Sequence, residues 1–548
     1  MPLNSLWLRT AAALLVCVSI ACTIYPHTNS AGAAAALPYD DIRPNYAQDA
    51  ILNMTKNKLM NGTGNRRFEP LKAVSRAEFI AMIDRLLAIK PVASPIPAFA
   101  DVPKTAWYYE WIQPAVQLGI AKGTFAARFE PGRSLTREEA AVILARALKQ
   151  SLDASPDTHG KPFNDQEQIS PWARSSVAQL VRIDLLAGND GKFLPRDLIT
   201  RQEAAVLMNR AWTHAGWTEQ LQGAQPAAIQ LGWQYNQTTQ QFKRQVTNSE
   251  VNTLSPRWYY LSKTGSIEDQ TDTPLVTWAR QEGKAVWAMV GNHSDQEATH
   301  AMLTDAKQRQ AFVRQLTDRV RKYGLDGLNI DFENMMPEDR NNFTAFIMAL
   351  HEEMKSIPAV LSVNVSPDFG TDWTAVFDYA ALARQADYIV LMGYDEHWGG
   401  APVPGSVSSL PWLRLGMETL LKQAPAHKVI LALPLYTRNW TVFGTGAIQS
   451  ADITLQQQDL LVSTKNVQVL WDDQLGQYRG QYYDASALLN QIWLEDGRSL
   501  AQKVSLGEQH QVAGYGYWYM GGESADVWTS VRNTIRFSSY HFSSSTAK

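Results

Sequence analysis

Apolar and polar positions follow two different patterns along the chain, and the pattern changes near residue 228. Before that point apolar residues recur at helical spacing, in short segments that turns separate, which predicts an all-α region. After it, short β-prone apolar runs alternate with helical stretches, which predicts a parallel sheet with crossover helices. A chain of 548 residues is long enough for about two to four domains, each with its own core.

The all-α region contains an internal repeat of about sixty residues, present three times between positions 39 and 215. Each unit opens near an aspartate and continues with an amphipathic helix, a turn and a second helix. The second helices are expected to begin at Ser75, Thr136 and Thr200, because glutamate stands three positions after each of them. That spacing is typical of a capping box.

Arginine directly follows each of these capping residues. Capping does not require arginine, and the start of a helix already favours anions. Arg76, Arg137 and Arg201 therefore predict an anion-binding arrangement in every repeat.

The three units resemble S-layer homology (SLH) repeats, which in that family form a three-lobed helical module that binds an anionic, often pyruvylated, secondary cell-wall polymer. The resemblance implies a wall anchor of the Gram-positive type, in which the three arginines contact the acidic sugar. It also implies stacking surfaces at Trp107 and Trp172, where the first repeat has Tyr46 instead.

The second region contains eight candidate strands over about 310 residues. Eight strands that alternate with helices fit a (β/α)8 TIM barrel, whose active site lies at the C-terminal ends of its strands. The predicted fold class is therefore α/β, a TIM barrel preceded by an all-α three-repeat module. The candidate strands are residues 229–233, 253–261, 285–290, 327–332, 360–365, 388–392, 429–433 and 512–518.

The fourth candidate strand carries polar residues, whereas a strand that served packing alone would be almost continuously apolar. Because side chains alternate along a strand, Asn329, Asp331 and Glu333 share one face, which in a barrel is the interior. Acidic groups there are costly unless they are hydrogen-bonded and used. The three residues are candidates for chemistry, and a satisfied buried salt bridge is the alternative.

The segment from Asp326 to Glu333 resembles the D-G-x-D-x-D-x-E signature of family 18 glycoside hydrolases. The resemblance implies that Glu333 is the general acid/base and that Asp331 orients the acetamido nitrogen of the substrate. In that family the substrate's own acetamido carbonyl is the nucleophile, an exception to the two-carboxylate scheme. An acid that works near neutral pH needs a raised pKa, which a partly desolvated barrel mouth beside a second carboxylate supplies.

Asn329 departs from this signature, since the family usually has aspartate at that position. We expect Asn329 to hydrogen-bond to Asp331 without sharing its proton, and the pH profile to be altered as a result. The same variant resembles the spore- and wall-lytic bacterial branch of the family, which favours peptidoglycan as the substrate.

Other strand ends resemble the same family. Tyr394 matches the tyrosine that hydrogen-bonds the acetamido oxygen, Asp395 the aspartate that contacts sugar hydroxyls, and Trp518 the floor beneath the distorted sugar. A looser match is the segment 255–258, which includes Arg257 and could equally serve packing. The remaining expected substrate contacts are Asp326, Met392, Tyr436 and Trp287.

Composition narrows the chemistry further. The formal net charge of −3 provides no basic field to hold nucleic acid. No histidine pair has metal-ligand spacing and no phosphate-cradling glycine pattern occurs, so neither a metal nor a cofactor is expected. Of the 18 tryptophans, 12 lie beyond residue 227, where their flat faces suit sugar rings, although most are expected in the core.

The N-terminus predicts export: Arg9 precedes an apolar stretch and then a region of small residues. An uncleaved membrane anchor is the alternative, but the apolar run is shorter than the ~20 residues of a spanning helix. Both cysteines lie in this segment, so a mature chain would have no disulfide. The expected divisions are a signal peptide (1–36), three repeats (37–95, 96–158 and 159–216), a linker (217–227), the barrel (228–537) and a tail (538–548).

The sequence thus predicts a secreted, wall-attached hydrolase that cleaves β-1,4 linkages of an N-acetylglucosamine-containing polysaccharide. Peptidoglycan is favoured over chitin because of the wall anchor and Asn329. A competing interpretation from a different class is a catalytically inactive, lectin-like barrel that only binds surface glycan. Such barrels typically lose the acid, whereas this chain keeps Glu333 and Asp331.

Overall fold

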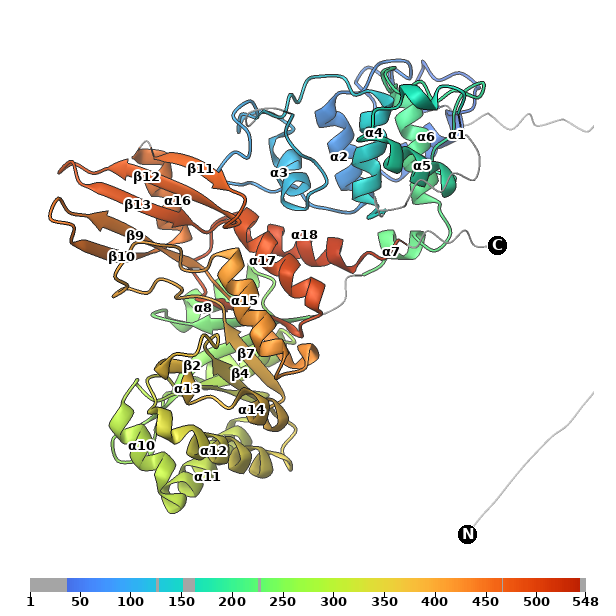
Figure 1. The fold of residues 1–548 in the computed structure, drawn as a ribbon. Helices are drawn as coiled ribbons and strands as arrows, with labels where there is room; N and C mark the ends of the chain where they lie inside the picture. Colours follow the sequence, from blue (N-terminus) through green and yellow to red (C-terminus); the bar gives the residue numbers. More distant parts are fainter. Residues whose placement is uncertain (1–36, 125–127, 151–162, 225–227, 466, 543–548) are drawn as a thin grey trace, which may run out of the picture.

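The computed structural model describes residues 37–124, 128–150, 163–224, 228–465 and 467–542. It shows a helical module at the N-terminal side, a barrel, and an antiparallel sheet that projects from the barrel beside the helical module (Figure 1). The expected signal segment, residues 1–36, lies outside the described residues. Within the described ranges, no helix is both long and apolar enough to cross a membrane.

The helical module contains two helices from each repeat. The predicted starts of the second helices are confirmed: Ser75, Thr136 and Thr200 are N-caps, and each forms a complete capping box with the glutamate three residues later. The repeat helices are α1 (Gln48–Lys56), α2 (Arg76–Leu86), α3 (Tyr109–Gln117), α4 (Arg137–Ala147), α5 (Arg174–Arg182) and α6 (Arg201–Trp212).

The three repeats close on one another through a ring of backbone hydrogen bonds. The N–H of Val74 donates to the carbonyl of Ile199, the N–H of Ile199 to that of Leu135, and the N–H of Leu135 to that of Val74, at 2.9–3.0 Å. Each bond joins the residues just before a second helix in two different repeats. The module is therefore a pseudo-threefold assembly with one shared core.

The aspartates that recur in the repeats fasten the turn before each second helix. The carboxylate of Asp101 accepts hydrogen bonds from the backbone N–H groups of Phe129 and Glu130 at 2.8 and 2.7 Å. Asp41 and Asp165 form the equivalent bonds in their own repeats. Burial acts to raise the pKa of these carboxyls, but the backbone hydrogen bonds outweigh it, so all three pKa values are lowered.

The barrel is a closed sheet of eight parallel strands, which confirms the predicted fold class and strand count. The first and last strands pair with each other, so the sheet has no free edge except where short β3 (Ile267–Asp269) adds to β2. The barrel strands are β1 (Ile229–Gln234), β2 (Thr253–Leu261), β4 (Ala285–Gly291), β5 (Gly327–Asp331), β6 (Val360–Val365), β7 (Tyr388–Met392), β8 (Val429–Pro434) and β14 (Gly514–Trp518).

Helices surround this sheet and bury its outer face in a large apolar cluster. A smaller cluster of seven buried residues, among them Trp233, Trp287 and Met289, fills the barrel interior. The surrounding helices are α8 (Thr239–Thr247), α9 (Thr273–Gln281), α10 (Gln296–Thr304), α11 (Ala306–Tyr323), α12 (Arg340–Met354), α13 (Asp372–Ala375), α14 (Tyr379–Gln385), α15 (Leu410–Leu421), α17 (Gly497–His510) and α18 (Val527–Ser539).

An antiparallel sheet of five strands is inserted between β8 and α17, and the sequence pattern did not predict it. Along β12 and β13, buried positions alternate with positions that are exposed or partly exposed. These strands therefore lack the continuous apolar runs of the barrel strands. The inserted elements are β9 (Tyr436–Val442), β10 (Ile448–Thr454), α16 (Leu455–Thr464), β11 (Gln468–Asp472), β12 (Gln477–Tyr483) and β13 (Leu489–Leu494).

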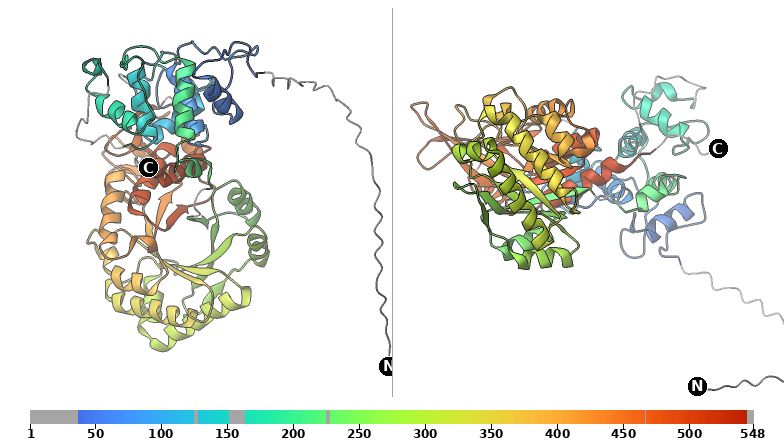
Figure 2. Two further views of the ribbon diagram at one scale, coloured as in Figure 1. Left: turned by 90° about the vertical axis from the view of Figure 1, so that its right-hand side faces the viewer. Right: turned by 90° about the horizontal axis from the view of Figure 1, so that it is seen from below.

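The helical module packs directly on the barrel along α18 (Figure 2). The side chain of Asn533 on α18 bonds both the N–H and the carbonyl of Lys90, at 3.0 and 2.8 Å. Ile96, from the segment that joins the first two repeats, is buried against Tyr478 and Ile492 of the inserted sheet. The two bodies therefore share apolar contacts as well as hydrogen bonds.

Two expected divisions differ from the structure. Residues 217–227 were expected to be a linker, but α7 (Thr218–Gln222) forms there and Trp217 is fully buried in the core of the helical module. The tail was expected to begin at residue 538, yet α18 continues to Ser539. Beyond it, Tyr540 and Phe542 are buried in that same core. The described parts of these segments, residues 217–224 and 538–542, are held in place by tertiary contacts that the local sequence does not indicate.

Candidate functional site

The candidate site lies at the C-terminal end of β5. Strand register places Asn329 beside Met289 and Asp331 beside Gly291 of β4, so both point into the barrel, with Asp331 nearer the mouth. Phe332 turns outward and stacks on Phe346 of α12. Glu333 follows at the barrel mouth, on the same side as Asp331.

Glu333 is held through its backbone by Asn292, at the end of β4. The N–H of Glu333 donates to Oδ1 of Asn292 at 3.0 Å, and Nδ2 of Asn292 donates to the carbonyl of Glu333 at 2.8 Å. Oγ of Ser294 donates a longer bond of 3.4 Å to Oε2 of the carboxylate. The backbone at Glu333 is thus fixed, while its carboxyl group, which accepts the longer bond, stays available to a ligand.

The environment of Glu333 favours its protonated form. Burial is the largest cause, and the neighbouring carboxylates of Asp331 and Asp395 add to it, so that the pKa of Glu333 is raised to about 7. A carboxylic acid with this pKa can both donate and accept a proton near neutral pH, as a general acid/base must.

Asp331 receives its orienting hydrogen bond from Asn364 on β6, whose Nδ2 lies 2.9 Å from Oδ1 of Asp331. Burial raises the pKa of Asp331, and the hydrogen bond from Asn364 opposes that rise. The carboxylate is therefore fixed in direction by a neutral amide.

Asn329 is fully engaged, but not with Asp331 as the sequence led us to expect. Its Oδ1 accepts a hydrogen bond of 2.9 Å from the indole of Trp233. Its Nδ2 donates to Oγ of Ser362 at 3.0 Å and to Oδ1 of Asn364 at 2.7 Å. Asn329 thus reaches Asp331 through Asn364, because both of its amide protons are used on β6.

Ser362 and Asn364 are site residues that sequence reasoning missed. Both lie on the inward face of an otherwise apolar strand and are fully or almost fully buried. Two polar residues at alternate positions of a buried strand were a usable signal, since such groups must find partners.

Aromatic side chains surround the carboxylates. The Trp518 ring lies nearly parallel to that of Tyr394, with centroids 6.4 Å apart, and it also contacts Trp233 and Tyr235. Burial, followed by the charges of Asp331, Glu333 and Asp395, raises the pKa of Tyr394 well above its ordinary value. Tyr394 therefore stays a neutral hydroxyl that can donate a hydrogen bond.

Asp395 and Tyr436 form a second polar pair at the mouth. The hydroxyl of Tyr436 donates to Oδ1 of Asp395 at 2.5 Å, and Arg438 bonds the same oxygen at 3.2 Å. Asp395 adopts a left-handed backbone conformation (φ 64°) and its side chain is about half exposed. The buried Tyr436 thus holds an accessible carboxylate.

Arg257, in the middle of β2, lies among these aromatic rings. Its Cζ is 4.9 Å from the centroid of Tyr235 and 5.7 Å from those of Tyr260 and Trp518. A register shift between Arg257 and Tyr259 interrupts the pairing of β2 with β4 at this point. The site therefore combines carboxylates and aromatic faces with the guanidinium groups of Arg257 and Arg438.

The structure overturns two of the expected substrate contacts. Trp287 pairs with Gly327 at the start of β5, is almost fully buried, and stacks on Tyr388 inside the barrel. Asp326 precedes β5 and uses its carboxylate to bind the backbone N–H of Val286. Both lie at the N-terminal end of the strands, where side chains serve barrel packing and closure. Met392 ends β7 and is almost completely buried.

The arginines of the helical module are turned inward, onto the neighbouring repeat. Each guanidinium bonds a backbone carbonyl of the following repeat in cyclic order and lies over the aromatic ring of the same residue. These contacts join Arg76 to Phe129, Arg137 to Phe193 and Arg201 to Phe68. The arginines thus tie the repeats together, a role that the sequence did not indicate, and their expected contact with an acidic sugar stays a prediction.

The aromatic residues expected to stack on wall polymer lie on the surface. Trp107 and Trp172 are 58% and 56% exposed, and Tyr46 in the first repeat is 68% exposed. Large apolar side chains with so much exposed area are available to a ligand.

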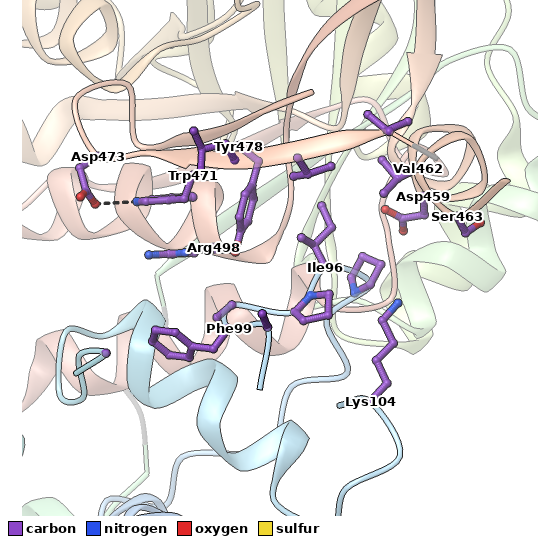
Figure 3. Close-up of a pocket in the computed structure, with 18 of the residues that line it drawn as sticks. Ile96, Phe99, Lys104, Asp459, Val462, Ser463, Trp471, Asp473, Tyr478 and Arg498 are labelled. Carbon is purple, nitrogen blue, oxygen red and sulfur yellow. Dashed lines mark hydrogen bonds between the residues drawn. The ribbon is translucent and has the colours of Figure 1, made fainter. Parts of the chain in front are cut away.

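A cavity of about 1210 Å³ lies elsewhere, between the inserted sheet and the segment that joins the first two repeats (Figure 3). Its lining includes Ile96, Phe99, Trp471, Tyr478 and Arg498, and none of the carboxylates at the end of β5. The cavity belongs to the contact between the two bodies.

Comparison with known proteins agrees with this geometry. The profile of glycosyl hydrolases family 18 matches residues 233–523, more than half of the chain. The chain belongs to glycosyl hydrolase family 18. S-layer homology domains match residues 38–80, 98–141 and 162–205. This family 18 glycosidase thus carries three SLH repeats, which imply binding to a cell-wall polymer and point to a bacterial cell surface.

Several relatives of this family 18 chain match about half of its length. It is 26% identical over 323 residues to the uncharacterized glycosylase YvbX of Bacillus subtilis, a match that covers 56% of this chain and 92% of YvbX. It is 24% identical to a cortical fragment-lytic enzyme of the same organism, over 49% of this chain and 64% of the relative. A solved chitinase from Chromobacterium violaceum shares the fold, with a TM-score of 0.52, 22% identity and coverage of 56% of this chain and 99% of the chitinase.

Proposed function

We propose that the barrel hydrolyses β-1,4 linkages of an N-acetylglucosamine-containing glycan, with peptidoglycan as the favoured substrate, by a substrate-assisted, retaining mechanism. The observation that carries the proposal is a buried carboxyl group, with a pKa of about 7, near a second carboxylate that an amide orients at an aromatic-lined barrel mouth. The catalytic residues are Glu333, Asp331 and Tyr394.

In the first step, the carboxyl group of Glu333 gives its proton to the glycosidic oxygen while the bond from that oxygen to C1 breaks. The carbonyl oxygen of the substrate's acetamido group attacks C1 from the other face and forms an oxazolinium ion. Asp331 accepts a hydrogen bond from the acetamido N–H, and the hydroxyl of Tyr394 donates one to the acetamido oxygen, so the nucleophile is held in line.

In the second step, the Glu333 carboxylate takes a proton from water as the water oxygen bonds to C1. The oxazolinium ring opens and the acetamido group is restored, so two inversions leave the configuration at C1 unchanged. Trp518 provides the apolar floor, and Asp395, Tyr436 and Met392 contact the sugar around it.

Wall attachment supports peptidoglycan as the substrate over chitin. We place the chain on the surface of a Gram-positive-type bacterium after removal of residues 1–36. There the SLH repeats hold an anionic wall polymer with Arg76, Arg137, Arg201, Trp107 and Trp172. The relatives named cortical fragment-lytic enzyme and chitinase represent the two competing substrate classes.

Digestion of purified peptidoglycan and of chitin, followed by mass spectrometry, tests the proposal. New reducing ends at N-acetylglucosamine identify a glucosaminidase, whereas unchanged peptidoglycan with degraded chitin would assign the chain to the chitinases. The variant E333Q keeps the size of the side chain but removes its acid, so it should be inactive on both substrates. Wild type and E333Q that are equally inactive on both substrates would instead support a lectin-like barrel.

A further inference from the structure

We propose that Arg257 recognises a carboxylate of the glycan next to the cleaved bond, and so makes the site selective for an acidic strand over neutral chitin. This inference rests on the proposed function and names the substrate class of the same site. It starts from an unusual neighbourhood, in which one cation lies among aromatic rings beside two acids.

Arg257 is placed where a bound sugar would be. Its guanidinium carbon is 5.7 Å from the centroid of Trp518, the proposed floor, and 4.9 Å from that of Tyr235. A sugar stacked on Trp518 therefore brings its own substituents, or those of the adjoining sugar, toward the guanidinium. The rings that border Arg257 come from β2, from β14 and from Tyr235 directly after β1, so barrel strands hold them in place around it.

The guanidinium of Arg257 can still donate hydrogen bonds to a ligand. Arg257 is only partly exposed, and its Nε is buried without a hydrogen-bond partner in the part of the chain that the structure describes. The Tyr260 hydroxyl accepts a hydrogen bond from the guanidinium, whereas the cation–π contacts with the rings do not use its in-plane N–H groups. A planar guanidinium binds a carboxylate through two parallel hydrogen bonds, which a lysine cannot reproduce.

The charge of Arg257 acts against the acid chemistry of the site. Burial raises the pKa of both Asp331 and Glu333, and Arg257 opposes that rise in each case. A residue that served only packing could be neutral, and it would then not lower the pKa of the catalytic acid. A ligand that carries its own negative charge accounts for a cation here, whereas uncharged chitin offers no partner for it.

Peptidoglycan supplies such a carboxylate next to N-acetylglucosamine. Its glycan alternates that sugar with N-acetylmuramic acid, whose lactyl group ends in a carboxyl. In intact peptidoglycan this carboxyl is joined by an amide bond to the stem peptide, whose own carboxylates are the second possible source. If the lactyl group is the one recognised, an amidase that removes the stem peptides must act before this enzyme.

The test compares kcat/KM of the wild type, R257M and R257K on four substrates. These are peptide-free glycan strands, the same strands after carbodiimide coupling of their carboxyls to methylamine, intact peptide-bearing strands, and a neutral chito-oligosaccharide. R384M is the matched control, because Arg384 is exposed on α14 on the outside of the barrel. Thermal unfolding of each variant checks its fold.

For R257M we expect the ratio of kcat/KM on a carboxylate-bearing strand to that on the neutral oligosaccharide to fall at least tenfold. R257K should lose less, and R384M should keep the wild-type ratio. A loss on the peptide-free strands identifies the lactyl carboxylate, and a loss confined to intact strands identifies the stem peptide. An unchanged ratio in R257M, or an equal loss on all four substrates, would overturn the inference.

Binding keeps this test separate from the test of the proposed function. If wild type and E333Q are equally inactive on every substrate, the proposed function fails. Calorimetric affinity of E333Q and of E333Q/R257M for the peptide-free strands still measures recognition in that case. A tenfold weaker affinity in the double variant supports the role of Arg257, and equal affinities refute it.

Discussion

The Nδ2 atom of Asn364 donates a 2.9 Å hydrogen bond to Oδ1 of Asp331, and no proton has to move for this bond to orient the carboxylate. The same side chain accepts a 2.7 Å bond from Asn329. A relay of two amides therefore stands where the family has an aspartate next to its orienting carboxylate. The two amides orient Asp331, but neither of them can share its proton or take up its negative charge.

N364A should lower kcat more than it changes KM. Without the amide, Asp331 loses the one side-chain donor that the described residues give it. It can then rotate away from the acetamido N–H, which we expect to reduce kcat about ten- to hundredfold. The pKa of Asp331 should also rise further, because burial remains and the opposing hydrogen bond is gone. S362A is the control, since Ser362 contacts Asn329 and not Asp331; an equal loss in both variants would contradict the relay.

Activity should decline as the pH rises through about 7. The catalytic form of Glu333 in the first step is the protonated acid, and burial with Asp331 and Asp395 raises its pKa to about that value. The alkaline limb of the kcat/KM profile in the free enzyme should therefore have its midpoint near pH 7. D395N removes one negative neighbour, so the pKa of Glu333 should fall and the midpoint should move to lower pH. A midpoint that stays in place, or moves to higher pH, would contradict this account.

N329D should destabilise the barrel although it restores the family residue. Asn329 uses its two amide protons on Ser362 and Asn364, and a carboxylate at 329 would instead face the carbonyl oxygen of Asn364. The loss of buried donors should cost about 1–3 kcal/mol of unfolding free energy. Denaturant titration followed by tryptophan fluorescence measures it. The same change at exposed Asn341 is the control, and equal stabilities of N329D and N341D would show that the amide is dispensable.

Variants of the helical module should show that its arginines and its tryptophans have different roles. Removing the Arg201 side chain leaves the carbonyls of Phe68 and Asn61 without their donor, so R201M should lower stability by about 1–3 kcal/mol. The change W107A removes an exposed side chain and should leave the melting temperature within error. In a sedimentation assay with purified cell walls, W107A should bind more weakly than the wild type. Unchanged wall binding in W107A and W172A would exclude these faces as stacking surfaces.

The local sequence pattern was sufficient to predict much of this protein's fold. Capping boxes, turns and apolar periodicity depend on residues a few positions apart, so the repeats, the eight barrel strands and the inward face of β5 were predictable. Trp287 shows the limit of this reasoning. Its place on a barrel strand could be read from the sequence, but its layer within the barrel depends on register with β5, which is set by residues far along the chain.

The tertiary structure decided which partners those residues have. The sequence by itself determined the two-part architecture, the family signature and the presence of Glu333 and Asp331. Only the fold brought Asn364 of β6 to Asp331, turned the arginines of one repeat onto the carbonyls of the next, and placed Arg257 against Trp518. The reason is physical: periodicity specifies which face of a strand or helix is buried, whereas hydrogen-bond partners and pKa values depend on which buried faces meet.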